Sequence, residues 1–572
     1  MSIPDNLRAQ AEKWASEDPD PITKAEIQKL LETGDREALE DRFQGMLQFG
    51  TAGLRGLLGA GPHRMNRSVV LRATAGLAAY VLREVEGAKE RGIAIGFDGR
   101  RMSREFAKDA AEVIAGFGIQ PLIFEDVVPT PLLGYAVVQS NAAAGIMVTA
   151  SHNPPNYNGY KVYWENGAQI IPPHDAGIAA EIAAIEAIAD IPRAEGKAVP
   201  FPASYRVNYL AAVKKLALHP DTPRDLRVVY SAMHGVGGAL VMDALADAGF
   251  AEVHPVVEQH EPDGEFPTVE FPNPEEDGAM DLALALAKEK DAELIIANDP
   301  DADRLACIVR HNGTYRPLSG NEIGSLFAHY LLDQGEGEKR LVLASVVSSP
   351  MLLSIGEAHQ ARAELTLTGH KWIHNRAMEL EPDGFRFVFG FEEALGYAIS
   401  PLVRDKDGVS AAAVMCDMAA WCKTQGRTLV DELELAWRRY GMFLSEQISV
   451  VLPGAEGAAQ IQGIMKRART DAPTSLGGLT VTAIQDFETG LRRDTEGAEE
   501  ALTFPQSNVV LFELEGGHRA MLRPSGTEPK IKFYFDVRVD IAEGESIEDA
   551  QSRGRTLLEN VTGDFRARFD PR

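Results

Sequence analysis

Helical patterns alternate with short apolar runs along most of this chain, and this alternation constrains the fold more than any other feature. Residues 69–84 have the apolar spacing of a helix, whereas residues 92–97 and 145–148 are apolar runs of strand length. Runs of the same kind recur at residues 227–230 and 293–297. Strands that alternate with helices are typical of parallel sheets covered by helices. The sequence therefore predicts an α/β fold for most of the chain.

The two ends of the chain depart from this rhythm. Leu7, Ala11 and Trp14 share one face of a first predicted helix, and Thr23 and Glu26 are predicted to form a capping box in a second. The C-terminal part shows strand-rich hairpin patterns around helices, which is typical of an α+β domain. A chain of 572 residues exceeds what one core organises, so we expect several domains. Their predicted limits are residues 1–203, 204–315, 316–442 and 443–572.

The net charge of −27 disfavours binding to nucleic acid or to an anionic membrane surface. An anionic substrate would therefore need a local positive pocket. Three cysteines are too few for a disulfide framework and fit a reducing compartment. Because the sequence shows neither a secretory signal nor a long apolar run, we expect a cytoplasmic protein without a membrane partner.

Three aspartates follow the apolar run at residues 293–297. Asp299, Asp301 and Asp303 occupy every second position, so they would point the same way if the backbone stayed extended. Their mutual repulsion requires a cation, and an oxygen-only site suits Mg²⁺. A solvated acidic turn is an alternative interpretation. A calcium loop of the EF-hand kind is disfavoured, because Arg304 occupies the position of the required glycine.

A second polar segment, TASHNP at residues 149–154, follows the apolar run at residues 145–148. A serine on a tight turn after a buried strand is placed as a nucleophile, and here that serine is Ser151. His152 and Lys161 are near enough in sequence to assist the transfer of a proton or of charge. A capped turn without chemistry is the alternative interpretation of this segment.

The segment RPSGTEP at residues 523–529 has the composition of an anion-binding turn. Arg523 and the hydroxyls of Ser525 and Thr527 would grip a phosphate. Gly526 would let the backbone form a nest around it. An ordinary turn between strands is the alternative. A nucleophile, a cation site and a phosphate cradle are together the parts that phosphoryl transfer requires, so the three segments predict that chemistry.

These segments, with four others in a fixed order, resemble the motifs of the α-D-phosphohexomutases, which include phosphoglucomutase, phosphomannomutase and phosphopentomutase. The resemblance runs nearly end to end, and ordered, spaced motifs of this kind are highly specific. The four further segments are FGTAGLRG at residues 49–56, TGHKWI at 368–373, GFEEALG at 390–396 and RDKDG at 404–408.

The resemblance implies three related α/β domains and a C-terminal α+β domain around a central cleft. It also implies a phosphorylated Ser151, and Mg²⁺ held by Asp299, Asp301, Asp303 and an oxygen on Ser151. The other residues that it places near the substrate form three groups. Those groups are the catalytic residues Arg55, His152, Lys161 and His370, the substrate-binding residues Arg304, Thr368, Gly369, Glu392, Glu393 and Lys406, and the phosphate-binding residues Arg523, Ser525, Gly526 and Thr527.

The resemblance further implies a reaction in which phosphoserine donates its phosphoryl group to a sugar monophosphate. The resulting bisphosphate turns around and returns its other phosphoryl group to Ser151, with His370 or Lys161 as the base. We expect phosphoglucomutase activity between hexose 1-phosphate and hexose 6-phosphate, with phosphomannomutase activity also expected. A bisphosphate activator such as glucose 1,6-bisphosphate is expected, and the protein is expected to be a monomer or a homodimer.

Two positions depart from the family pattern. Many hexomutases have a serine in the sugar loop where this chain has Ala394, and Ala52 occupies the position of a common aspartate. The first departure favours, as the alternative, a phosphopentomutase acting on ribose or deoxyribose 1-phosphate and 5-phosphate. A phosphosugar sensor without turnover is disfavoured by Ser151 and the complete aspartate triad. A phosphomonoesterase, the remaining rival, would release inorganic phosphate.

Overall fold

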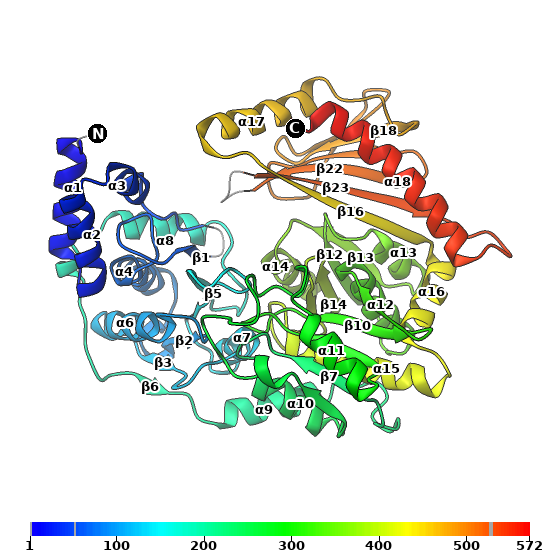
Figure 1. The fold of residues 1–572 in the computed structure, drawn as a ribbon, viewed down its shortest axis with the longest axis horizontal. Helices are drawn as coiled ribbons and strands as arrows, with labels where there is room; N and C mark the ends of the chain where they lie inside the picture. The colour runs from blue at the N-terminus through cyan, green and yellow to red at the C-terminus, as the bar shows by residue number, and fades with distance from the viewer. Residues whose placement is uncertain (1–2, 51–52, 526–529, 572) are drawn as a thin grey trace. The chain divides into compact units, whose positions relative to one another are not determined.

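The computed structural model describes residues 3–50, 53–525 and 530–571. Figure 1 shows the course of the chain from its N-terminus in blue to its C-terminus in red. None of the helices in these ranges has both the length and the apolar character of a membrane span. The three cysteines, Cys307, Cys416 and Cys422, are all buried as free thiols.

The chain forms two compact units, and neither is one continuous stretch of sequence. The first unit contains Met1–Leu318 and Gly396–Gly426. The second contains Ser319–Leu395 and Arg427–Arg572. The chain therefore leaves the first unit and later returns to it for one short segment.

The N-terminal helices α1 (Asp5–Glu17), α2 (Pro21–Thr33) and α3 (Arg36–Phe43) form a small core of their own. Leu7 and Ala11 are buried in this core, as their shared helical face predicts. A helix whose apolar residues repeat with the helical period can bury them only against another element, which here is supplied by its two neighbours.

The start of α2 differs from the prediction, because Thr23 does not cap it. Asp20 is the N-cap residue, and its carboxylate accepts a hydrogen bond of 2.9 Å from the amide of Ile22. The hydroxyl of Thr23 donates instead to Asp18. Pro21 explains the shift, since it lacks an amide hydrogen and already has the φ of a helix, and so fits the first helical position.

The first sheet of the first unit has the strand order β1-β5-β4-β2-β3-β6. Strands β2, β3 and β4 are parallel, and β5 runs antiparallel to β4 and β1. Every residue of β2 and β4 is buried, as in parallel strands that helices cover on both faces. Its strands are β1 (Gly53–Leu57), β2 (Ile93–Phe97), β3 (Pro121–Ile123), β4 (Ala144–Val148), β5 (Tyr157–Trp164) and β6 (Val199–Pro200), and its helices are α4 (Arg67–Glu84), α5 (Ala88–Arg91), α6 (Ser103–Gly116), α7 (Thr130–Gln139) and α8 (His174–Ala183).

The second sheet of this unit has the order β11-β10-β9-β7-β8, in which β7, β8 and β9 are parallel. The segment Gly396–Gly426, called here the returning segment, adds helix α15, which packs against α9 and α10. The strands of this sheet are β7 (Val228–Ser231), β8 (Val253–Pro255), β9 (Leu294–Ala297), β10 (Ala306–His311) and β11 (Thr314–Leu318), and the helices beside it include α9 (Ser204–Lys214), α10 (Gly238–Asp247) and α11 (Asp281–Lys290). The returning segment contains β15 (Gly396–Ala398), which is not a strand of this sheet, and α15 (Gly408–Thr424).

The second unit begins with an α/β sheet in which β12 lies between β13 and β14, and all three strands are parallel. Helices α12 and α16 pack against each other beside this sheet. Tyr440 ends α16, and the chain continues after one residue into the C-terminal sheet. The elements are α12 (Gly320–Asp333), β12 (Arg340–Ser345), α13 (Met351–Ala358), β13 (Arg362–Thr366), α14 (His370–Leu380), β14 (Arg386–Glu392) and α16 (Leu429–Tyr440).

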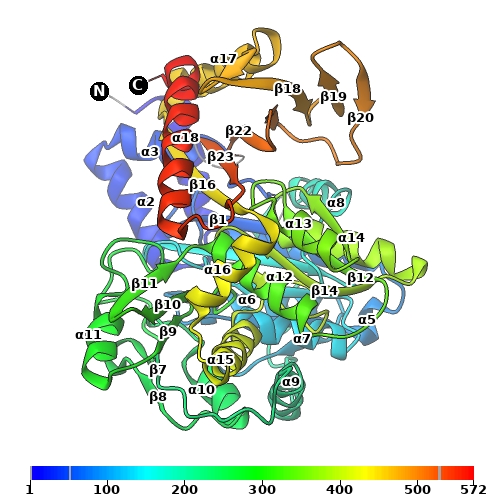
Figure 2. The same cartoon turned by 90° about the vertical axis from the view of Figure 1, so that its right-hand side faces the viewer.

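The C-terminal sheet is antiparallel, with the order β16-β23-β22-β21-β18-β19-β20 and with β17 paired to β18. Helices α17 and α18 lie against the same sheet (Figure 2), and Phe565 and Phe569 of α18 bury their rings in its core. The elements are β16 (Met442–Val451), α17 (Gly454–Thr470), β17 (Ser475–Leu476), β18 (Leu479–Asp486), β19 (Leu491–Asp494), β20 (Glu499–Ala501), β21 (Val510–Leu514), β22 (His518–Pro524), β23 (Lys530–Val539) and α18 (Ile547–Phe569).

The chain contains three sheets flanked by helices, followed by a C-terminal domain of mixed helices and antiparallel strands. This arrangement confirms the predicted fold class. The predicted domain limits at residues 203, 315 and 442 stay predictions, because the two units are defined by contacts rather than by those limits.

Candidate active site

The loop after β4 presents Ser151 at the carboxyl end of a buried strand. Ser151 has a φ of 51°, and its side chain is almost fully buried. Its amide donates a hydrogen bond of 2.9 Å to the hydroxyl of Thr149. Its own hydroxyl donates to Oδ2 of Asp299 at 2.7 Å, and lies 3.3 Å from Nδ1 of His152. The hydroxyl of Ser151 is therefore held toward the aspartate loop.

The aspartate loop follows β9, and its backbone is not extended as we expected. Residues 300–302 form a turn, and Ala302 has a φ of 56°. The turn nevertheless brings Asp299, Asp301 and Asp303 together, with one carboxylate oxygen of each within 4.8 Å of the others. All three side chains are fully buried. Three buried carboxylates at this separation repel one another strongly unless positive charge is close.

Positive side chains of the same unit supply part of that charge. Lys161 on β5 places Nζ 2.6 Å from Asp301 and 2.8 Å from Asp303. Lys406, in the returning segment, lies 3.2 Å from Asp303. Arg304 is farther away, with Nε 4.0 Å from the carboxylate of Asp303. The predicted residues Lys161, Arg304 and Lys406 therefore all lie around the aspartates.

These charges act unequally on the three carboxylates. Burial, together with the negative charges of Asp301 and Asp303, raises the pKa of Asp299 to about 8. Burial alone would also raise the pKa of Asp303, but Lys161 and Lys406 hold that pKa below its ordinary value. Nε of Arg304 also lies 4.0 Å from Asp299, and its charge opposes the rise of that pKa without cancelling it, so these side chains neutralise the three carboxylates only in part.

The Oδ1 atoms of Asp301 and Asp303 show where more positive charge would fit. Oδ2 of Asp301 accepts hydrogen bonds from Lys161 and from Thr130, and Oδ2 of Asp303 accepts one from Lys161. Oδ1 of each is buried and, within the described parts of the chain, has no hydrogen-bond partner. Buried carboxylate oxygens are normally satisfied. The set of oxygens therefore fits a hard divalent cation such as Mg²⁺.

Arg55 and His152 complete the surroundings of the serine loop. Arg55 on β1 donates a hydrogen bond of 3.0 Å to the side chain of Asn153, two residues after Ser151. Burial and the charges of Arg304 and Arg55 hold the pKa of His152 well below its ordinary value. The imidazole of His152 is therefore neutral near pH 7.

The predicted sugar-binding residues of the second unit gather between β14 and α14. Oε1 of Glu392, at the end of β14, accepts a hydrogen bond of 2.7 Å from the amide of Gly369. His370 begins α14, and its Nε2 lies 4.0 Å from Glu392. Thr368 precedes them in the same turn. The predicted partnership of these residues with Lys406, which belongs to the first unit, stays a prediction.

Glu393 is held beside Glu392 by two serines. The hydroxyls of Ser345 and Ser348 each lie 3.2 Å from Oε2 of Glu393, and the amide of Glu393 donates to Ser348 at 3.0 Å. Burial and the charge of Glu392 raise the pKa of Glu393, while the charges of Lys532 and Arg523 oppose this rise. Two positive residues of the C-terminal sheet therefore favour the ionised form of Glu393.

The predicted phosphate turn joins β22 to β23. Arg523 is opposite Lys532 in the antiparallel ladder, and the amide of Ser525 donates to the carbonyl of Lys530 at 2.8 Å. These contacts concentrate positive charge where the two strands approach the turn. Gly526 and Thr527, which were predicted to grip the phosphate, lie outside the described residues, as does Ala52.

Two residues at the serine and aspartate loops were not predicted from the sequence. Thr130, at the start of α7, donates to Asp301 at 2.7 Å. Arg100, just after β2, donates to backbone carbonyls of the serine loop, including that of Pro154 at 2.9 Å. A usable signal existed for Arg100, since β2 and β4 are neighbouring parallel strands and the loops after them meet at one edge of the sheet. Thr130 had no comparable signal.

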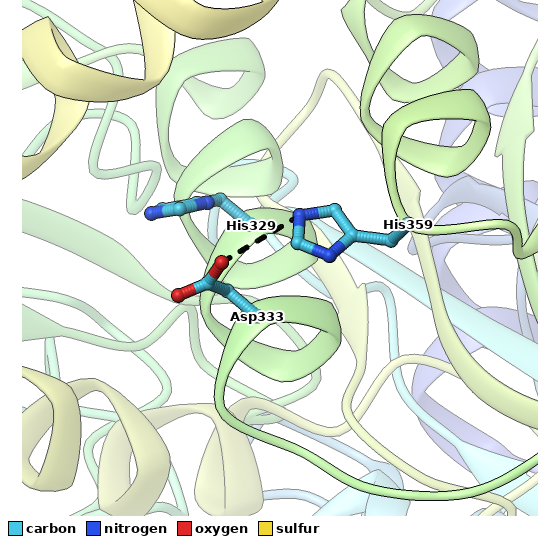
Figure 3. Close-up of side chains that lie close together, drawn as sticks. All are labelled: His329, Asp333 and His359. Carbon is cyan, nitrogen blue, oxygen red and sulfur yellow. Dashed lines mark ion pairs between the residues drawn. The ribbon is translucent and has the colours of Figure 1, made fainter.

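A second group of possible metal ligands, His329, Asp333 and His359, lies in the second unit (Figure 3). Nε2 of His359 is 3.9 Å from Asp333. However, the hydroxyl of Tyr440 lies between the rings, 2.9 Å from Nδ1 of His329 and 2.7 Å from Nε2 of His359. The other nitrogen of His329 is 3.0 Å from Glu432. These ring nitrogens are used in hydrogen bonds, so we interpret the group as a polar network that joins α12 to α16.

Comparison with known proteins gives matches along most of the chain. Family models described as phosphoglucomutase/phosphomannomutase alpha/beta/alpha domains I, II and III match residues 46–189, 207–313 and 319–440. A Haemophilus influenzae protein named "Probable phosphomannomutase" is 43% identical over 481 residues, which cover 83% of this chain and 93% of that protein. The phosphopentomutase of Mus musculus is 36% identical over 561 residues, which cover 93% of this chain and 90% of the mouse protein.

A crystal structure of a phosphoglucomutase/phosphomannomutase family protein from Burkholderia thailandensis has the same fold. Its TM-score is 0.64 at 19% sequence identity, and the match covers 91% of this chain and 96% of that one. The fold and these matches define a phosphosugar mutase, an isomerase that acts as an intramolecular phosphotransferase, so the predicted enzyme class is confirmed. The chain belongs to the α-D-phosphohexomutase family.

Proposed function

We propose that this mutase interconverts hexose 1-phosphate and hexose 6-phosphate through a phosphorylated Ser151 and a sugar bisphosphate. The observation that supports this most directly is the 2.7 Å hydrogen bond from the Ser151 hydroxyl to the buried aspartate triad. A serine hydroxyl placed beside a site suited to a divalent cation is equipped to exchange a phosphoryl group. The phosphoglucomutase/phosphomannomutase description of the three matching domain models supports a hexose as the sugar.

In the proposed forward step, the bond between phosphorus and Oγ of Ser151 breaks while a bond forms to the free hydroxyl of the sugar phosphate. The proton of that hydroxyl passes to a base, for which His370 and Lys161 are the candidates. The bisphosphate then turns around, and a bond forms from Oγ of Ser151 to its other phosphorus while the bond from that phosphorus to the sugar oxygen breaks. The base returns its proton to this sugar oxygen, which leaves the product monophosphate and phosphorylated Ser151. A bisphosphate activator such as glucose 1,6-bisphosphate would supply the first phosphoryl group to Ser151.

The residues around Ser151 have separate tasks in this scheme. Asp299, Asp301 and Asp303, with an oxygen on Ser151, would hold Mg²⁺, which supplies positive charge to the phosphoryl group in transfer. Lys161 places a further positive charge at the same site. Its pKa, which burial alone would lower, is raised by Asp301 and Asp303, so the ammonium stays charged near pH 7. A charged ammonium cannot accept a proton, so of the two candidates this favours His370 as the base.

Substrate assays test the proposal directly. Purified protein with Mg²⁺ and glucose 1,6-bisphosphate is assayed on glucose, mannose, ribose and deoxyribose 1-phosphates, and both the 5- or 6-phosphate product and inorganic phosphate are measured. We expect the highest kcat/KM for a hexose 1-phosphate, with sugar phosphate as the product. Release of inorganic phosphate as the main product would instead identify a phosphomonoesterase.

A pentose is the second candidate substrate, and two observations favour it. Ala394 offers no hydroxyl in the sugar loop, and the mouse relative that matches 93% of this chain is named a phosphopentomutase. A site that hydrogen-bonds a substrate hydroxyl rejects analogues lacking it, because its own polar group would be left unpaired. Loss of that group relaxes the rejection, so we expect measurable activity on ribose 1-phosphate.

Substitution of Ala394 gives a sharper prediction. Ala394→Ser should raise the ratio of kcat/KM for glucose 1-phosphate to that for ribose 1-phosphate by about fivefold, the equivalent of about 1 kcal/mol for one hydrogen bond. Ala542→Ser, in an exposed loop, serves as the matched control and should leave the ratio unchanged. A wild-type protein inactive on pentose phosphates, with an unchanged ratio in Ala394→Ser, would show that Ala394 does not govern sugar choice.

The phosphate turn gives a further prediction. Arg523→Ala should raise KM by about 10- to 100-fold, because charge-assisted hydrogen bonds to the non-reacting phosphate are worth about 1.5–3 kcal/mol. A smaller fall in kcat is also expected, since remote binding energy supports turnover. Arg493→Ala removes an exposed arginine from β19 of the same sheet and should change neither constant. If Arg523→Ala also changes neither, Arg523 does not bind the phosphate.

A further inference from the structure

The conformation of Ser151 is unusual for a residue with a side chain. Its φ of 51° lies in the left-handed region, which L residues other than asparagine and aspartate rarely adopt. Such a residue persists only where its surroundings hold it in place. The direction of the Ser151 hydroxyl depends on this backbone conformation, because rotation about φ and ψ would carry Oγ away from Asp299.

Arg100 is the residue that holds most of the loop backbone. Its guanidinium donates to the carbonyls of Ser151 and Asn153, to that of Pro154 at 2.9 Å and to that of Tyr157 at 3.3 Å. These acceptors span the loop from the serine to the start of β5. Arginine suits this task because it presents five donors in a rigid fork, whereas lysine has three donors on one rotating group.

The guanidinium is itself fixed on several sides. Arg100 is only 4% exposed, so it is positioned to hold the loop rather than to bind a solvent-borne ligand. The carboxylate of Asp98 lies 3.4 Å from its Nε, and the ring of Phe266 lies 4.9 Å from its central carbon. The amide of Arg100 also donates to Asp98 at 3.0 Å. A side chain held in this way imposes its own geometry on the carbonyls that it contacts.

We propose that Arg100 is a positioning residue for phosphoryl transfer, which keeps Ser151 in the left-handed conformation that directs its hydroxyl at the aspartate triad. Thr149 assists by accepting the amide hydrogen of Ser151 at 2.9 Å, so the loop is held at both the amide and the carbonyl of the serine. The inference rests on the proposed function, in which Ser151 accepts the phosphoryl group.

The test measures phosphorylation of Ser151 separately from sugar binding. Wild type, Arg100→Lys and Arg101→Ala are incubated with Mg²⁺ and glucose 1,6-bisphosphate, and the rate of phosphate incorporation at the Ser151 peptide is followed by mass spectrometry. Arg101 is the matched control, since it donates to Pro155 of the same loop at 3.2 Å but is exposed. Steady-state kcat and KM for glucose 1-phosphate and the thermal midpoint are measured on the same preparations.

We expect Arg100→Lys to fold and to keep KM within about threefold, while kcat and the phosphorylation rate both fall by about 100-fold, as for a misplacement of about 1 Å. Arg101→Ala should stay within about twofold of wild type, because one exposed contact contributes little. If the role of Arg100 were purely structural, Arg100→Lys would lower the thermal midpoint but would not lower kcat at an unchanged KM. Phosphorylation of Arg100→Lys at the wild-type rate would overturn the inference.

Two further outcomes are also decisive. If Arg100→Lys does not fold, Thr149→Val decides, because it removes the acceptor for the Ser151 amide with little change in shape. A loss of kcat at unchanged KM in this variant supports the inference, and wild-type kinetics overturn it. If wild type itself takes up no phosphate at Ser151, the proposed function fails, whereas equal uptake by wild type and Arg100→Lys refutes the positioning role alone.

Discussion

Ser151→Ala should lose mutase activity by about 10⁴-fold or more, because the proposed reaction passes through a covalent bond to its hydroxyl. The fold should be unaffected, since the substitution removes only one oxygen, which lies 2.7 Å from Asp299. Activity is measured as kcat/KM on glucose 1-phosphate with the bisphosphate activator. Ser16→Ala, which removes an exposed hydroxyl in α1, is the matched control and should behave as wild type.

The same variant also tests whether the proposed phosphate adduct is carried by Ser151. The intact mass of wild type should show a population carrying one phosphate, and that phosphate should map to the peptide containing Ser151. The Ser151→Ala protein should lack this adduct. Near-normal turnover by the purified variant, or an adduct found only on another peptide, would contradict the role of Ser151.

The second large effect is expected at the aspartate triad. Asp301→Asn should lower kcat by about 10²- to 10³-fold, a size typical for removing one group that stabilises charge in a transition state. Binding of the sugar phosphate should change much less, because the proposed cation would act mainly on the group in transfer. Asp247→Asn changes an exposed aspartate at the end of α10 and should have no effect.

Metal dependence supplies the accompanying measurement. The activity of wild type should disappear in excess chelator and return when Mg²⁺ is added, while Asp301→Asn should need a higher Mg²⁺ concentration for half-maximal activity. The thermal midpoint is recorded for each variant, since Asp301 also accepts hydrogen bonds from Lys161 and Thr130. Full activity of wild type in excess chelator would refute a required metal.

The α/β architecture was predictable because helical and strand periods are local properties of the sequence. The apolar runs at residues 92–97 and 293–297 correspond to β2 and β9 in the structure. The return of residues 396–426 to the first unit was not predictable in this way. It depends on contacts such as the hydrogen bond from Tyr163 to Asp405, which are 242 residues apart, and no periodicity records such a pairing.

Some residues of the candidate site were likewise predictable from the sequence, and others were not. Ser151 and the three aspartates stand in short motifs whose spacing indicates their chemistry, and the structure places them together. The turn at Ala302 was not foreseen, because a period-two spacing describes an extended strand and cannot reveal one residue with a positive φ. The sheet topology placed Arg100 near the serine loop, but its contacts could not be predicted. Its partners are backbone carbonyls, which every residue has, so no residue type in the sequence indicates them.

The discontinuous first unit has a consequence for how the chain acquires its structure during synthesis. Helix α15 packs against α9 and α10, and the buried hydroxyl of Tyr209 donates to Asp407 at 2.7 Å. These partners are missing until about residue 426 has left the ribosome, although the rest of the unit ends at Leu318. At roughly 5–20 residues per second, the intervening stretch of roughly 100 residues takes about 5–20 s to make. During that interval the nascent first unit exposes the surface that α15 later covers, and exposed apolar surface of this kind is what makes a partly folded chain prone to aggregation.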